Sequence, residues 1–121
     1  MNESAMRLLF VDDNTRMRHF LMTVVGDLLT DSDEAANGLE AVEKYERFRP
    51  DAVLMDIRMP LSDGFEATQR IMSEHPDARV LIVTDFDTPE YRMLAKRAGA
   101  SGFIPKDHLL DLPAVLKALR S

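Results

Sequence analysis

Residues 52–56, Ala-Val-Leu-Met-Asp, predict a buried strand, because a short apolar run that ends in a carboxylate is typical of one. Residues 8–13, Leu-Leu-Phe-Val-Asp-Asp, repeat the pattern. Two buried strands that each end in aspartate suggest one shared site, formed by Asp12, Asp13 and Asp56. Three neighbouring anions repel one another unless a cation holds them. An all-oxygen cluster suits a hard divalent cation such as Mg²⁺.

The composition is that of one soluble globular domain, which we expect to span residues 1–121. Hydrophobic residues make up 45% and charged residues 30% of the chain. The net charge of −6 argues against a surface that binds nucleic acid directly. Cysteine is absent, which excludes disulfides and thiolate metal sites. No apolar run approaches membrane-spanning length and no signal peptide is recognisable, so we expect a cytoplasmic protein without membrane contact.

Short apolar runs and amphipathic segments alternate along the chain. Asn14 has the chemistry of a helix N-cap, and Asn37-Gly38 indicates a turn. The segment 30–35 is polar, which predicts only a short edge strand. We expect strands at 6–11, 30–35, 52–56, 80–84 and 102–104, and helices at 15–28, 39–48, 65–73, 89–98 and 112–120.

Five strand–helix units predict an α/β fold with a single doubly wound, five-stranded parallel sheet and helices on both faces. The first, third and fourth strands are apolar on both faces, as central parallel strands must be. With right-handed crossovers and the polar strand at an edge, the favoured strand order is 2-1-3-4-5, the flavodoxin-like arrangement. Ligands of such sheets bind beyond the carboxyl ends of the strands where the winding reverses, between strands one and three.

Two more polar residues are expected at the same edge of the sheet. Thr84 ends the fourth strand and Lys106 follows the fifth. A lysine ammonium suits a phosphate oxygen, and a hydroxyl donates one hydrogen bond to the same group. Together with a magnesium ion, these residues could bind and move a phosphoryl group. Asp56 is the candidate nucleophile, because carboxylates form aspartyl phosphates, and Pro60 and Gly64 are expected to leave space above it.

These residues belong to a wider set with a specific joint spacing: Asp12-Asp13, Asp56, Met59-Pro60, Gly64, Thr84, and Phe103 three residues before Lys106. The set resembles the receiver domain of bacterial two-component response regulators, including chemotaxis regulators, and the resemblance covers essentially the whole chain. It implies that Asp56 accepts phosphate from the phosphohistidine of a sensor histidine kinase or a phosphotransfer protein. It also implies that Asp13, Asp56 and the backbone carbonyl of Arg58 ligate Mg²⁺ directly, and Asp12 mostly through water.

The resemblance further implies a conformational switch. Thr84 and Lys106 would hold the phosphoryl oxygens, and Phe103 would turn inward as Thr84 shifts, which reshapes the face built from the fourth helix, fifth strand and fifth helix. The domain would then be a signalling element that catalyses its own phosphorylation and dephosphorylation, and not an enzyme acting on other substrates. Asp85 stands where relatives carry a small residue, so we expect its carboxylate to repel a phosphoryl donor or slow the switch.

Three other functions fit the sequence less well. A phosphatase of the haloacid dehalogenase type needs a second aspartate two residues after the nucleophile, where this chain has Arg58. A flavin- or nucleotide-binding module needs a glycine-rich loop after the first strand, where this chain has Asp-Asp-Asn-Thr. A pseudo-receiver that only binds partners is disfavoured by the complete set of acidic residues, Thr84 and Lys106.

The expected partners beyond the kinase are a downstream effector or a C-terminal output domain. Residues 100–107 resemble receivers attached to helix-turn-helix DNA-binding domains, so the receiver part of a DNA-binding transcriptional regulator and a stand-alone regulator both remain open. Homodimer formation on phosphorylation is a further family expectation. His19, His75 and His108 lack ligand spacing, and we expect them at the surface or partly packed.

Overall fold

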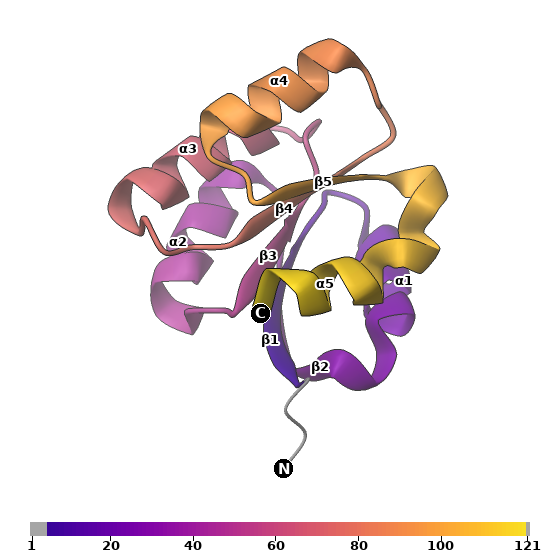
Figure 1. Ribbon diagram of the computed structural model, residues 1–121. Coiled ribbons are helices and arrows are strands. Elements are labelled where there is room, and N and C mark those ends of the chain that lie inside the picture. Colours follow the sequence, from indigo (N-terminus) through magenta and orange to yellow (C-terminus); the bar gives the residue numbers. More distant parts are fainter. Residues whose placement is uncertain (1–4, 121) are drawn as a thin grey trace.

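The structure, a computed structural model, describes residues 5–120 and contains one five-stranded parallel sheet in the order β2-β1-β3-β4-β5. Helices α1 and α5 cover one face of the sheet, and α2, α3 and α4 cover the other (Figure 1). The predicted fold class and strand order are therefore confirmed. The strands are β1 (Met6–Val11), β2 (Leu29–Ala35), β3 (Ala52–Met55), β4 (Val80–Thr84) and β5 (Gly102–Pro105). The helices are α1 (Thr15–Val25), α2 (Gly38–Phe48), α3 (Gly64–Glu74), α4 (Pro89–Ala98) and α5 (Leu112–Arg120).

Each face of the central strands carries its own hydrophobic core. Successive side chains of a strand point to opposite faces, so Leu54 packs toward α1 and α5 while Val53 packs toward α2, α3 and α4. All four residues of β3 and all five of β4 are buried. This two-sided burial is why these segments are uniformly apolar in the sequence.

The register of the sheet aligns the strand ends that carry the aspartates. Val11 pairs with Met55 on one side and with Ala35 on the other. The next residues continue the ladder, because Asp56 N–H donates to the Val11 carbonyl at 2.9 Å and Asp12 N–H donates to the Ala35 carbonyl at 3.1 Å. Asp12 and Asp56 therefore leave the sheet side by side.

The second strand is an edge strand, as predicted, and it spans seven residues, beginning one residue before the predicted range 30–35. Its backbone pairs with β1 along most of its length. The flanking helices pair with two of its acidic side chains, since Arg18 of α1 lies 2.8 Å from Glu34 and Lys44 of α2 lies 3.6 Å from Asp33. Backbone pairing and these ion pairs explain how a polar segment forms a full strand.

Several element boundaries differ from the predictions for local reasons. The α1 helix ends at Val25 and a 3₁₀ turn, η1 (Gly26–Leu28), replaces its predicted last turn, because Gly26 has a φ of 59°. Gly38 opens α2 instead of forming a turn, since the Asn37 side chain caps the helix by accepting from Glu40 N–H at 2.9 Å. A 3₁₀ segment, η2 (Lys106–Asp111), was not predicted. No helix within residues 5–120 has the length and apolar character needed to span a membrane.

Candidate functional site

The two buried aspartates lie at the carboxyl edge of the sheet. Asp12 is 2% exposed and Asp56 is 8% exposed, so both carboxylates are largely removed from water but neither is fully sealed. Asp12 Oδ1 accepts the backbone N–H of Asn14 at 2.9 Å, which orients its other oxygen toward the site. Arg18 donates to the Asp12 backbone carbonyl at 2.6 Å and so connects this strand end to α1.

Asp13 completes an all-oxygen cluster. Carboxylate oxygens of Asp12, Asp13 and Asp56 all lie within 4.8 Å of one another, and Asp13 is exposed whereas the other two are buried. This donor set fits a hard divalent cation with oxygen ligands. The exposed side of the cluster leaves a path by which such a cation and its waters could enter.

Lys106 supplies the positive charge of the site. It begins η2 directly after β5, and its Nζ lies 3.0 Å from Asp12 Oδ2 and 3.5 Å from Asp56 Oδ1. Burial raises the pKa of the Asp56 carboxyl to about 6, the Asp12 charge adds to this rise, and the Lys106 ammonium opposes it. Burial lowers the pKa of Lys106, but the charges of Asp56 and Asp12 outweigh it and the net pKa is raised. Lys106 therefore stays charged beside the carboxylates.

Thr84 ends β4 and is 1% exposed. Its Oγ1 accepts the backbone N–H of Phe86 at 3.1 Å, so the hydroxyl is joined to the loop between β4 and α4. Asp85 in the same loop is exposed, and its charge contributes to the raised pKa of Lys106. The loop therefore adds a fourth carboxylate near the site.

Gly64 contributes through close backbone contact, which corrects the expectation that it leaves open space above Asp56. A Cβ at position 64 would lie 2.0 Å from the Asp56 carbonyl oxygen. Gly64 N–H donates to the Ile57 carbonyl at 2.8 Å, so the loop after β3 folds back directly onto the strand end. Only glycine permits this approach, and the turn holds the Asp56 backbone.

Arg58 links the two loops that flank the site. Its guanidinium lies 3.8 Å from the Phe86 ring centroid and donates to the Tyr91 hydroxyl at 3.1 Å. These three residues, with Thr88, Pro89 and Glu90, line a cavity of about 390 Å³. The sequence pattern did not indicate the role of Tyr91, because its partner lies 33 residues away.

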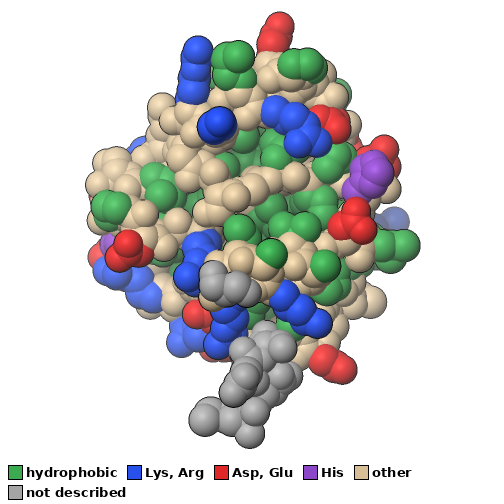
Figure 2. All heavy atoms as spheres, viewed as in Figure 1, with side chains coloured by type: hydrophobic (Ala, Val, Ile, Leu, Met, Phe, Trp, Pro, Cys, Tyr) green, Lys and Arg blue, Asp and Glu red, His purple; other side chains and the backbone are tan. Residues whose placement is uncertain are grey.

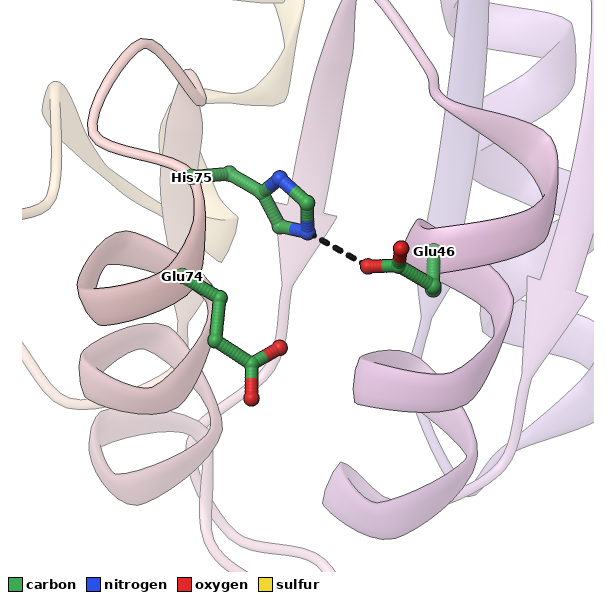
Figure 3. Close-up of side chains that lie close together, drawn as sticks. All are labelled: Glu46, Glu74 and His75. Atoms are coloured by element: carbon green, nitrogen blue, oxygen red, sulfur yellow. Dashed lines mark hydrogen bonds and ion pairs between the residues drawn. The ribbon is translucent and has the colours of Figure 1, made fainter.

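A second group of possible ligands lies away from the aspartates, between the C-terminal ends of α2 and α3 (Figure 3). His75 Nε2 lies 2.6 Å from Glu46 Oε2, and Arg49 donates to the other Glu46 oxygen at 2.9 Å. The His75 ring also packs on Tyr45, with centroids 4.9 Å apart. These contacts make the group a polar network that joins the two helices, and His75 is partly packed as predicted.

Comparison with known proteins identifies the family. The model of the response regulator receiver domain matches residues 8–119. The chain belongs to the response regulator receiver domain family. Receiver domains are signalling domains of two-component systems, and the match favours this function over the phosphatase and flavoprotein alternatives.

Individual receivers agree with this assignment. Chemotaxis protein CheY of Halobacterium salinarum is 39% identical over 115 residues, which cover 95% of this chain and 94% of that protein. The uncharacterized transcriptional regulatory protein YxjL of Bacillus subtilis is 37% identical over 111 residues, covering 90% of this chain but 51% of that protein. The CheX–CheY–BeF3–Mg²⁺ complex from Borrelia burgdorferi has a TM-score of 0.83 and 28% identity, covering 94% of this chain and 87% of that chain. This receiver chain thus matches whole single-domain relatives and half of a longer regulator.

Proposed function

We propose that Asp56 is the phospho-accepting residue of this receiver domain. The observation that carries the proposal is the contact of one ammonium group, Lys106, with both buried carboxylates, Asp12 and Asp56, beside the exposed Asp13. This arrangement combines a nucleophile, a counter-charge and an oxygen cluster at the edge of the sheet where ligands bind.

The reaction is phosphoryl transfer to a carboxylate. An Asp56 carboxylate oxygen forms a bond to phosphorus, the N–P bond of the donor phosphohistidine breaks, and its electron pair stays on the imidazole nitrogen. The product is an acyl phosphate on Asp56. Lys106 and Thr84 hold the phosphoryl oxygens through an ammonium and a hydroxyl donor. A hydroxyl at position 84 is available for this role because its interaction with Phe86 N–H uses only an acceptor lone pair.

The cofactor in this proposal is Mg²⁺. Asp13, Asp56 and the Arg58 backbone carbonyl would ligate it directly, and Asp12 mostly through water. When bound, the cation supplies positive charge against the carboxylates and the phosphoryl oxygens. The donor chemistry of the three aspartates and the presence of Mg²⁺ in the related Borrelia burgdorferi CheY complex both support this assignment.

The output of the reaction is a conformational change. The new oxygens on Asp56 attract the Thr84 hydroxyl, which draws the loop after β4 toward the site and changes the position of Phe103. The face formed by α4, β5 and α5 then differs between the two forms. Such a face would be recognised by a downstream effector or an attached output domain, or by a second copy of the chain.

The partners follow from the same proposal. The phosphoryl donor is a sensor histidine kinase or a phosphotransfer protein of the cytoplasm. A role as the receiver part of a DNA-binding regulator is a second candidate, supported by the match to half of the transcriptional regulator YxjL. In that case the attached domain, and not this acidic chain, would bind nucleic acid.

The test is phosphorylation by acetyl phosphate, followed by intact mass, with Mg²⁺ or with EDTA. The expected result is a gain of one phosphoryl group with Mg²⁺ only. Asp56→Asn should abolish it, while Asp27→Asn, which changes an exposed carboxylate on η1, should leave it intact. Labelling of Asp56→Asn to the wild-type extent would refute the assignment, and sustained turnover of a generic phosphomonoester would favour a phosphatase.

A further inference from the structure

A cation covers the Phe103 ring. The Arg92 guanidinium of α4 lies 4.7 Å from the ring centroid. The ring also packs against the core beneath α2, α3 and α4. The half-buried Phe103 side chain therefore contacts both the hydrophobic core and one guanidinium group.

The guanidinium is itself fixed by a carboxylate from the preceding loop. Arg92 Nε donates to Asp87 Oδ1 at 2.6 Å, and Nη2 donates to Asp87 Oδ2 at 3.0 Å. This two-point contact defines the plane of the guanidinium as well as its position. It leaves a flat face of the cation free to lie on the Phe103 ring.

Asp87 belongs to the loop that follows Thr84, the last residue of β4. The Thr84 hydroxyl accepts Phe86 N–H at 3.1 Å, one residue before Asp87. Arg92 N–H donates to the Thr88 carbonyl at 3.0 Å in the first turn of α4. A continuous set of contacts thus runs from Thr84 through the loop to Arg92 and ends on the Phe103 ring.

We propose that the Asp87–Arg92 pair is a positioning device that holds Phe103 in the observed place and couples the ring to the loop that follows Thr84. The inference rests on the proposed function, in which phosphorylation of Asp56 moves Thr84 and Phe103. Since the contact exists in the observed ring position, any change that moves the ring away must break it. The pair therefore stabilises the unphosphorylated form, and its removal makes the conformational change on phosphorylation easier.

The expected size of the effect follows from the exposure of the pair. The Arg92 and Asp87 side chains are 51% and 43% exposed, so the ion pair alone contributes little. The contribution specific to the switch is the cation–π contact, which at an exposed site corresponds to roughly a two- to fivefold change in an equilibrium constant. A lysine at position 92 keeps the charge but cannot both bind Asp87 at two points and lie flat on the ring.

The surface around the contact is accessible. A groove of about 300 Å³ beside α4 and β5 is lined by Arg92, Lys96, Phe103 and neighbouring small residues. Figure 2 shows hydrophobic side chains between α4 and α5, bordered by Lys and Arg side chains on the α4 side. When the Phe103 ring moves away from Arg92, the shape of this face changes and the guanidinium charge is no longer placed on the ring.

The experiment places a fluorinated phenylalanine at position 103 of the full chain and follows its ¹⁹F resonance during titration with beryllium fluoride in Mg²⁺. Arg92→Ala, Arg92→Lys and Asp87→Ala are compared with wild type. Arg97→Ala is the matched control, because it removes another exposed arginine from the same helix. The three test variants should shift the resonance before beryllium fluoride is added and bind it roughly two- to fivefold more tightly. The control should match wild type in the position of the ¹⁹F resonance and in the affinity for beryllium fluoride.

Two failures are distinguishable. If wild type responds to beryllium fluoride but the test variants behave like Arg97→Ala, or bind more weakly than wild type, the positioning role is wrong and the proposed function stands. If wild type itself shows no response, the proposed function is wrong and the coupling is wrong with it.

Discussion

The Lys106 ammonium lies 3.0 Å from the Asp12 carboxylate, although 94 residues separate them in the chain. Both side chains are nearly buried, with 12% and 2% exposure. The contact joins the tips of β1 and β5 across the C-terminal edge of the sheet. It also leaves Lys106 within 3.5 Å of Asp56, so one cation serves two carboxylates.

Replacing Lys106 by methionine should slow phosphorylation of Asp56 by acetyl phosphate by about 100-fold, the size expected for losing one charge-stabilising donor. Lys106→Arg should recover part of the rate because it retains the charge. Intact-mass kinetics at saturating Mg²⁺ measures the phosphorylation rates of the two variants. A loss of less than about threefold in the methionine variant would show that Lys106 does not contact the transferred group.

Asp56→Asn should stabilise the cation-free protein above pH 6. The pKa of Asp56 is raised from 3.8 to about 6, so between these values the folded state holds a proton that the unfolded state has lost. Wild-type stability therefore falls as the pH rises through this window. With allowance for solvent screening, the variant should gain about 1–2 kcal/mol at pH 7.5 and lose this advantage near pH 4. Urea unfolding in EDTA at the two pH values measures the difference in the free energy of unfolding between the variant and wild type. A stability gain of equal size at the two pH values would contradict the raised pKa of Asp56.

Mg²⁺ should stabilise the protein through the three aspartates. At a concentration 100 times the dissociation constant, binding to the folded state adds about 2.7 kcal/mol to the free energy of unfolding. Asp13→Asn removes the exposed ligand of the cluster and should reduce this gain strongly, whereas Asp27→Asn should not. Thermal unfolding across a Mg²⁺ titration measures the stabilisation of each variant by the cation. Equal stabilisation of Asp13→Asn and Asp27→Asn would exclude Asp13 as a ligand.

Asp85→Ala should accelerate labelling by acetyl phosphate. The exposed Asp85 carboxylate is close enough to influence Lys106, and it opposes the approach of an anionic donor. The acceleration should be roughly two- to fivefold at low ionic strength and should shrink as salt screens the repulsion. Rates measured at about 20 mM and about 500 mM salt, roughly a fivefold change in the screening length, test this. An acceleration that does not depend on salt would indicate a steric effect.

Leu61→Asn should stabilise the fold. Leu61 has a φ of 73° and is 79% exposed, so its side chain carries left-handed strain without the benefit of burial. Asparagine tolerates this conformation, and the expected gain is about 0.5–1 kcal/mol in urea unfolding. Leu110→Asn is the control, because Leu110 is 91% exposed and has no positive φ. A gain of similar size in the control would assign the effect to reduced surface hydrophobicity.

Local patterns explain why so much of the architecture was predictable. The uniformly apolar run before Asp56 identifies a strand buried on both faces, and the polar segment before Ala35 identifies an edge. The ion pairs of that edge strand with Arg18 and Lys44 were not predictable, because these two residues come from other elements. The η2 segment was missed because it is only six residues long and its backbone departs from helical geometry at His108, which has a φ of −120°.

The fold class and the aspartates at two strand tips could be predicted, because hydrophobic periodicity and strand ends are local properties of the chain. The strand order followed from these patterns together with the handedness of the crossovers. Only the packing of the folded chain sets the contacts of Lys106 with Asp12, of Gly64 with the Asp56 carbonyl and of Arg92 with Phe103. Each of these contacts joins residues from different elements. Their geometry depends on strand register and loop packing, which no local pattern in the chain encodes.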